Sequence, residues 1–227
     1  MKKIKINQLY HDYNSNKSLI NISCEFHQTK RYLVVGAHQS GKSTLCKLIK
    51  GLIKRRRGSI RIDDQLFKPP TQQSLSYLSQ NTYLYANITI SQFIKYYCDM
   101  YSDFNVTKSI FLLQQFNIST KRKITLLTQK EQELILFIFT LCRKADFYLL
   151  DNPLKSFSLK KKANIIKFTF NHLDKDNCII ITANSFVHFK SIFDHVLFLS
   201  RGYLFLNKDT NSMKVDSSED LEINDLK

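Results

Sequence analysis

A phosphate-loop pattern between a buried strand and a helix constrains this 227-residue chain more than any other feature of its sequence. The pattern G-x-x-x-x-G-K-[ST] follows an apolar, β-branched run at residues 31–35 and precedes a helix-like stretch at 42–53. Glycines let backbone N–H groups curl around a phosphate there, and the helix N-terminus adds positive potential. The loop consists of Gly36, Ala37, His38, Gln39, Ser40, Gly41, Lys42, Ser43 and Thr44. We therefore expect a nucleoside phosphate site, with Lys42 at the β/γ oxygens and Ser43 at Mg²⁺.

A second element of such a site lies more than a hundred residues later. Residues 147–150 form a short apolar run that predicts a buried strand, and Asp151 ends it. An aspartate at this end of a parallel strand faces the phosphate loop and holds Mg²⁺, usually through water. Asp151 is therefore a candidate metal residue together with Ser43.

Strands alternate with helices along the rest of the chain. Residues 31–35, 147–150 and 178–181 read as buried strands, and 196–199 with 203–205 as a hairpin. The stretch from about 88 to 142 repeats apolar residues at helical spacing. We expect Gly58 to close the helix at 42–53, and a strand at 59–62. The pattern predicts an α/β fold with a mostly parallel core and an inserted helical segment.

Composition narrows the class of protein. Hydrophobic residues make up 43% of the chain, yet the longest uninterrupted apolar run, at 134–139, is far too short for a membrane span. The basic N-terminus has no apolar signal core behind it, and the five cysteines show no paired spacing. We expect a protein of a reducing cytosol that neither crosses a membrane by itself nor is secreted.

The charge is strongly basic and unevenly spread. Of the net +15, the segment from Lys208 onward contributes −3 through six acids and three lysines, so the remainder carries +18. Such a body is drawn to polyanions, namely nucleic acid, nucleotide phosphates or an acidic membrane. A general lysine bias with solvated faces explains the charge equally well.

Together with the phosphate loop and the strand that ends at Asp151, the order of elements in the chain resembles the ATP-binding subunits of ABC transporters, from about residue 3 to 206. Tyr13, 23 residues before Gly36, matches the aromatic residue that stacks on adenine in that family. Gln80 matches the glutamine-loop residue that contacts Mg²⁺ and the attacking water. Residues 88–91 resemble the start of the family's helical subdomain, and Asp194 with Gly202 its closing segment. Residues 101–104 and 113–123 are similar to one subgroup, Gram-positive exporters of peptides and lantibiotics.

The resemblance implies a P-loop NTPase (RecA-like) core with a mostly parallel sheet, an N-terminal antiparallel β part and an inserted α-helical subdomain. It implies one ATP-binding domain at 1–206, with helices inserted at about 88–143, and an acidic, flexible tail at 207–227. It also implies ATP and Mg²⁺ as cofactors. The partners would be a membrane permease and a second ATP-binding subunit, in a heterodimer or a homodimer. The chain would be cytoplasmic, peripheral on the inner face of the membrane through the permease, whose coupling helix would sit near residues 80–93.

Several positions depart from the family pattern. The signature that binds the partner's γ-phosphate becomes Thr128 followed by residues 129–131, so both glycines are lost and Glu131 adds negative charge. Thr128 keeps a hydroxyl for nucleotide binding. Asn152 replaces the catalytic glutamate, and a neutral amide can orient water but accepts no proton. Residues 155–158 lack the aspartate of the D-loop, and Ala183 replaces the switch histidine. His188 lies five residues too late and reads as a surface histidine.

Three functions therefore compete. The first is an ATP-binding subunit of an exporter that couples ATP binding and slow hydrolysis to a permease. The second is a non-hydrolysing ATP sensor that regulates a partner, favoured by Asn152 and Ala183. The third is a nucleic-acid or ribosome factor, suggested by the basic body. Such factors carry two of these domains in one chain, and no aromatic-basic pattern for single strands is evident, so we expect no nucleic acid partner.

Overall fold

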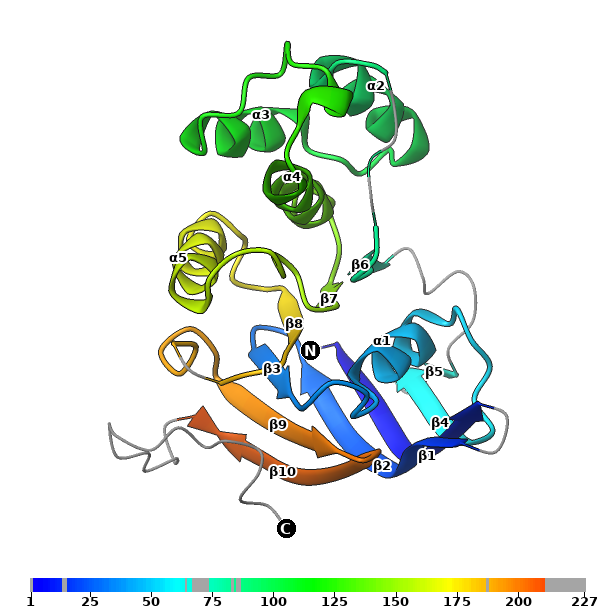
Figure 1. The fold of residues 1–227 in the computed structure, drawn as a ribbon. Coiled ribbons are helices and arrows are strands. Elements are labelled where there is room, and N and C mark those ends of the chain that lie inside the picture. Colours follow the sequence, from blue (N-terminus) through cyan, green and yellow to red (C-terminus); the bar gives the residue numbers. More distant parts are fainter. Residues whose placement is uncertain are drawn as a thin grey trace.

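The computed structural model describes residues 2–13, 16–63, 65–66, 74–82, 84, 87–186 and 188–210. Its core is a six-stranded sheet in the order β10-β9-β3-β8-β7-β6 (Figure 1). The five strands from β9 to β6 run parallel, and β10 pairs antiparallel with β9. The strands span Leu75–Leu78 (β6), Phe147–Leu150 (β7), Cys178–Ala183 (β8), Arg31–Val35 (β3), His195–Ser200 (β9) and Tyr203–Asp209 (β10).

A second, four-stranded antiparallel sheet has the order β2-β1-β4-β5. It is formed by Asn16–His27 (β2), Lys3–Tyr13 (β1), Arg57–Ile62 (β4) and Gln65–Leu66 (β5). The α/β fold with a mostly parallel core and an N-terminal antiparallel part is therefore confirmed. The hairpin expected at the C-terminal end is also present as β9 and β10.

The helical segment lies between β6 and β7, as the periodicity predicted. It contains α2 (Ile90–Met100), α3 (Val106–Gln115), a 3₁₀ turn (Ile124–Leu126) and α4 (Gln129–Leu141). These helices gather at one end of the molecule, with α4 between the other two and the core sheet (Figure 1). Of the helices in the described ranges, none is long and apolar enough to cross a bilayer.

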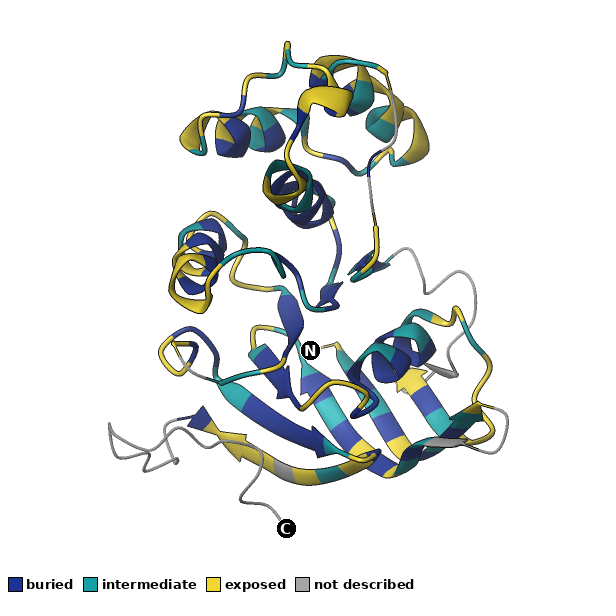
Figure 2. Ribbon diagram, in the orientation of Figure 1, coloured by how far each residue is buried: buried dark blue, intermediate teal, exposed yellow. Residues whose placement is uncertain are grey.

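The parallel strands are buried on both faces, which explains their continuous apolar sequences. All residues of β7 and β8 are buried, and β8 has the dark blue of buried residues along its length in Figure 2. Successive side chains alternate between two cores. Leu33 and Val35 face the helical side with α4 and α5 (Leu159–Phe170), whereas Tyr32 and Val34 face the side of α1 and the antiparallel sheet.

Two boundaries differ from the sequence expectation. Helix α1 spans Lys42–Lys50, not 42–53, because Gly51 takes the left-handed conformation (φ 78°) that caps it. Gly58 lies instead in β4 with φ 86°, where a Cβ atom would stand 2.2 Å from the Gln8 carbonyl oxygen. At the other end, β10 continues to Asp209, so the sheet extends past residue 206. Residues 211–227 of the expected tail lie outside the described residues.

Candidate nucleotide site

The phosphate loop joins the carboxyl end of β3 to the N-terminus of α1, and two glycines set its shape. A Cβ atom at Gly36 would lie 2.2 Å from the Leu199 carbonyl oxygen and 2.4 Å from the Ser40 hydroxyl. Gly41 takes φ 105°, and a Cβ atom there would lie 2.5 Å from the Ser18 carbonyl oxygen. The loop therefore requires glycine at both positions where the pattern has it.

Lys42 is buried inside this loop. Its Nζ donates to the carbonyl oxygens of Gly36 at 2.6 Å and Ala37 at 2.7 Å, and to the Ser40 hydroxyl at 3.2 Å. Burial lowers the pKa of the ammonium to about 8, although the nearby charge of Asp151 opposes that shift. Lys42 thus remains mostly charged at neutral pH, next to the backbone that would surround a phosphate.

Three side chains whose oxygen atoms could bind a metal lie together beside the loop. Ser43 Oγ donates to Asp151 Oδ1 at 3.0 Å and lies 3.4 Å from Gln80 Oε1. Asp151 is 2% exposed and also accepts a 2.9 Å hydrogen bond from Thr182 Oγ1. Mg²⁺ prefers oxygen ligands and is usually held by one or two carboxylates together with substrate phosphates and water. Ser43, Gln80 and Asp151 therefore fit the metal-binding role expected of them.

Most of the residues predicted to bind nucleotide or metal line one cavity of about 520 Å³. Its lining consists of Tyr13, Ser18, His38, Gln39, Ser40, Gly41, Lys42, Ser43, Thr44, Gln80, Asp151, Asn152 and Asn184. Tyr13 keeps 45% of its surface exposed, which leaves ring area for a stacked base. Gly36 and Ala37, which were also expected to bind nucleotide, are not among the lining residues. Their carbonyl oxygens accept hydrogen bonds from the Lys42 ammonium.

Two lining residues were not among the predicted site residues. Ser18 donates a 2.8 Å hydrogen bond to Thr44 Oγ1. It comes from β2, far from the loop in sequence, and no motif marks it. Asn184 follows the Ala183 position in sequence, so the strand end at 178–183 could have indicated it. His188 is exposed and is not part of the lining, as expected of a surface histidine.

Thr128 lies apart from this cavity, at the N-cap of α4. Its hydroxyl accepts the Glu131 N–H at 3.3 Å, and the Glu131 carboxylate accepts the Thr128 N–H and hydroxyl, each at 2.8 Å. The same carboxylate pairs with Arg122. Arg122, and then the Thr128 donors, lower the pKa of Glu131 to about 2. The N-terminus of α4 therefore already holds an anion from its own chain.

Comparison with known proteins agrees with this geometry. A sequence model of the ABC transporter family matches residues 19–155, more than half of the chain. The chain belongs to the ABC transporter family. The matched region includes the phosphate loop, the helical segment and Asp151, so the chain carries the ATP-binding domain of that family.

Individual ABC proteins are similar over nearly the whole chain. A phosphonates import ATP-binding protein of Fusobacterium nucleatum subsp. nucleatum is 24% identical, over 94% of this chain and 95% of its own. An ABC transporter ATP-binding protein of Bacillus subtilis, YtrB, is 22% identical, over 94% and 72%. Among solved structures, a bacterial Atm1-family ABC exporter with ATP bound superposes with a TM-score of 0.80 at 19% identity, covering 92% of this chain and 39% of that one.

Proposed function

We propose that this chain is an ATP-binding subunit that couples ATP binding, with slow hydrolysis, to a membrane permease. The observation that carries the proposal is the cavity that gathers Tyr13, Lys42, Ser43, Gln80 and Asp151. When bound, Mg²⁺·ATP supplies the phosphoanhydride whose binding drives closure. The chain's own residues stack on the base, neutralise the phosphates and hold the metal.

Fluorescent-ATP titration tests the binding step. Lys42→Ala removes a charge-assisted contact to phosphate and should weaken ATP binding at least about tenfold. Lys54→Ala is the matched control, because Lys54 is exposed and lies outside the cavity lining. An unchanged affinity in Lys42→Ala, or an equal loss in both variants, would refute the proposed site.

We propose a second ATP-binding subunit as partner, since in this family each ATP lies between one subunit's loop and the other's signature. The α4 N-terminus carries Gln129 and Lys130 in place of the two glycines, and the Glu131 carboxylate that caps it would repel a partner's γ-phosphate. A homodimer would have this repulsion at both nucleotides. A heterodimer with a relative whose signature keeps its glycines is therefore favoured. Light scattering on a sizing column with ATP and Mg²⁺ tests this, and a stable homodimer of this chain would contradict it.

Permease docking is supported by a groove of about 370 Å³ between β6, α2 and α4. Tyr77, Leu84, Phe93, Tyr97 and Tyr101 are among its lining residues, next to the predicted coupling region at 80–93. Co-purification of the chain with a hydrophobic protein encoded beside it would support a transporter subunit that is peripheral on the inner face of the membrane. The exporter direction rests on the resemblance of residues 101–104 and 113–123, whereas the similar protein of Fusobacterium nucleatum is named as an importer.

The second candidate is a non-hydrolysing ATP sensor. The observation that favours it is Asn152, which lines the cavity at the position of the catalytic glutamate. A sensor would pair in response to ATP without a permease. Copurification with a soluble partner and no membrane protein would therefore favour the sensor.

A further inference from the structure

Asn152 lies at the edge of the nucleotide cavity with its backbone fixed. Its φ of 45° is left-handed, a conformation that asparagine tolerates better than most residues. Its N–H donates to Thr182 Oγ1 at 2.8 Å, and that hydroxyl in turn donates to Asp151. Only the side-chain torsions of Asn152 are left to decide which amide atom faces the cavity.

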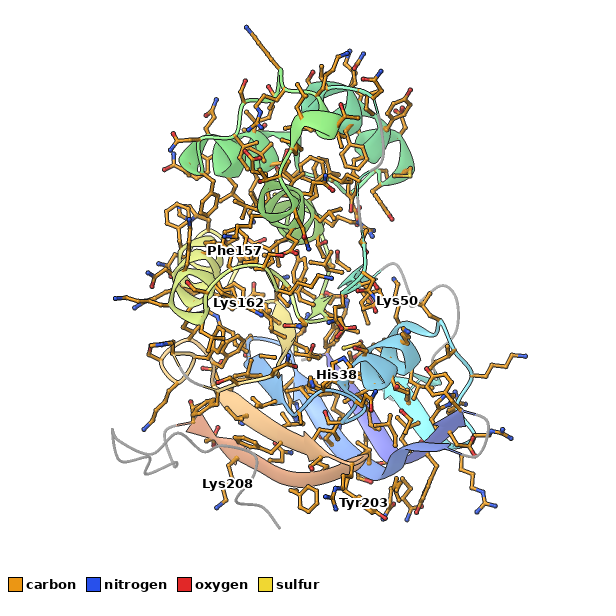
Figure 3. The ribbon with its side chains drawn as sticks, viewed as in Figure 1. His38, Lys50, Phe157, Lys162, Tyr203 and Lys208 are labelled. Carbon is orange, nitrogen blue, oxygen red and sulfur yellow. The ribbon has the colours of Figure 1, made fainter. Side chains whose placement is uncertain are left out.

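A buried lysine on the next helix fixes those torsions. Lys162, on α5 (Figure 3), is 4% exposed, and its Nζ lies 3.1 Å from Asn152 Oδ1. An ammonium can only donate, so the atom that it meets must be the amide oxygen. Burial lowers the pKa of Lys162 to about 8, and the charge of Glu133 opposes that shift. The group is therefore mostly charged at neutral pH.

We propose that Lys162 is a positioning residue of the ATP site: it holds Asn152 Oδ1 away from the cavity, so that the Asn152 amide N–H groups face the terminal phosphate as donors. The position that carries a proton acceptor in hydrolysing relatives thereby becomes a phosphate-binding position. Hydrogen bonds from a neutral donor to a charged phosphate oxygen are among the stronger ones in proteins. This inference rests on the proposed ATP-binding function and concerns the preference of the site for ATP over ADP.

A double-mutant cycle on nucleotide affinity tests the inference. Lys162→Met removes the donor with little change of volume, and Asn152→Ala removes the amide. Each change should lower ATP affinity roughly tenfold and leave ADP affinity within about twofold. The double variant should lose about tenfold rather than a hundredfold, because Lys162 acts through Asn152. Lys160→Met, on the exposed face of α5, is the control and should bind both nucleotides like the parent chain.

Additive losses, equal losses of ATP and ADP affinity, or an unchanged ATP preference in Lys162→Met would each overturn the positioning role. If Lys162→Met does not fold, Lys162→Gln retains a donor for Asn152 Oδ1 and should keep the ATP preference that Asn152→Ala loses. Loss of the preference in Lys162→Gln would overturn the proposal. Failure of the ATP site itself would be seen separately, as ATP binding that does not depend on Lys42.

Discussion

Replacing Glu131 with alanine should destabilise the fold by an amount that can be worked out from its contacts. The carboxylate accepts two hydrogen bonds from Thr128 at the α4 N-terminus and pairs with Arg122. Thr128 remains as the N-cap of α4, and losing the reciprocal half of the capping box that Glu131 supplies costs about 1 kcal/mol, the usual net value of a hydrogen bond. The ion pair adds only about 0.5 kcal/mol, because the two side chains are 37% and 26% exposed and water screens them.

The total of about 1.5 kcal/mol corresponds to a fall in melting temperature of about 3–6 °C for a domain of this size. Circular dichroism during heating measures it. Glu131→Gln keeps an oxygen acceptor for Thr128 but loses the charge, so its melting temperature should fall by only about 1–2 °C. Lys130→Ala, exposed in the same turn, is the control. A Glu131→Ala variant that melts with the Lys130→Ala variant would refute the reasoning.

The charge contribution of Glu131 should also depend on pH with a definite sign. Its pKa in the folded chain is about 2, below the ordinary value of 4.5. The unfolded chain therefore binds the proton first, and the stabilisation is complete above about pH 4.5. It should disappear as the pH falls from 4.5 toward 2. Urea unfolding of the parent chain and of Glu131→Gln at pH 7 and pH 3.5 should show a smaller difference at the lower pH, and an equal or larger one would contradict the assigned pKa.

Three other changes have definite expected outcomes. Asp151→Asn removes the buried carboxylate of the metal group and should largely abolish the Mg²⁺ dependence of ATP binding, measured by titration with and without the metal. Gly36→Ala places a methyl group against the Leu199 carbonyl oxygen and should lower stability by about 2 kcal/mol or more in urea unfolding. Asn152→Glu alone should restore little turnover in a single-turnover assay, because Lys162 would pair with the new carboxylate; a gain as large as in Asn152→Glu combined with Lys162→Met would contradict this.

The parts of the site that lie next to a strand end could be predicted from the sequence. The loop follows β3 and Asp151 follows β7, and strands of this buried type run parallel, so their carboxyl ends meet at one edge. Helical periodicity in 88–142 likewise predicted α2, α3 and α4. In each case a local pattern determines the placement without knowledge of the tertiary contacts.

Contacts that depend on tertiary packing could not be predicted. The bond from Lys162 to Asn152 requires the turn after β7, where Asn152 and Leu154 take positive φ without being glycine. Sequence reasoning found Glu131 as a misplaced charge, but its pairing with Arg122 depends on how the 3₁₀ turn approaches α4. The end of α1 was placed too late because Gly51 and Gly58 are equivalent as sequence signals.

We propose above all that this chain binds Mg²⁺·ATP and hydrolyses it slowly. The direct measurement is a single-turnover experiment, in which excess chain is mixed with trace labelled ATP and Mg²⁺ and quenched at intervals. We predict that ATP becomes bound and is cleaved at only about 0.0001–0.1 per second, because loss of a positioned general base costs roughly 10²–10⁴-fold in rate. Bound ATP that turns into ADP at about 1 per second or faster, as is usual for enzymes, would contradict this prediction.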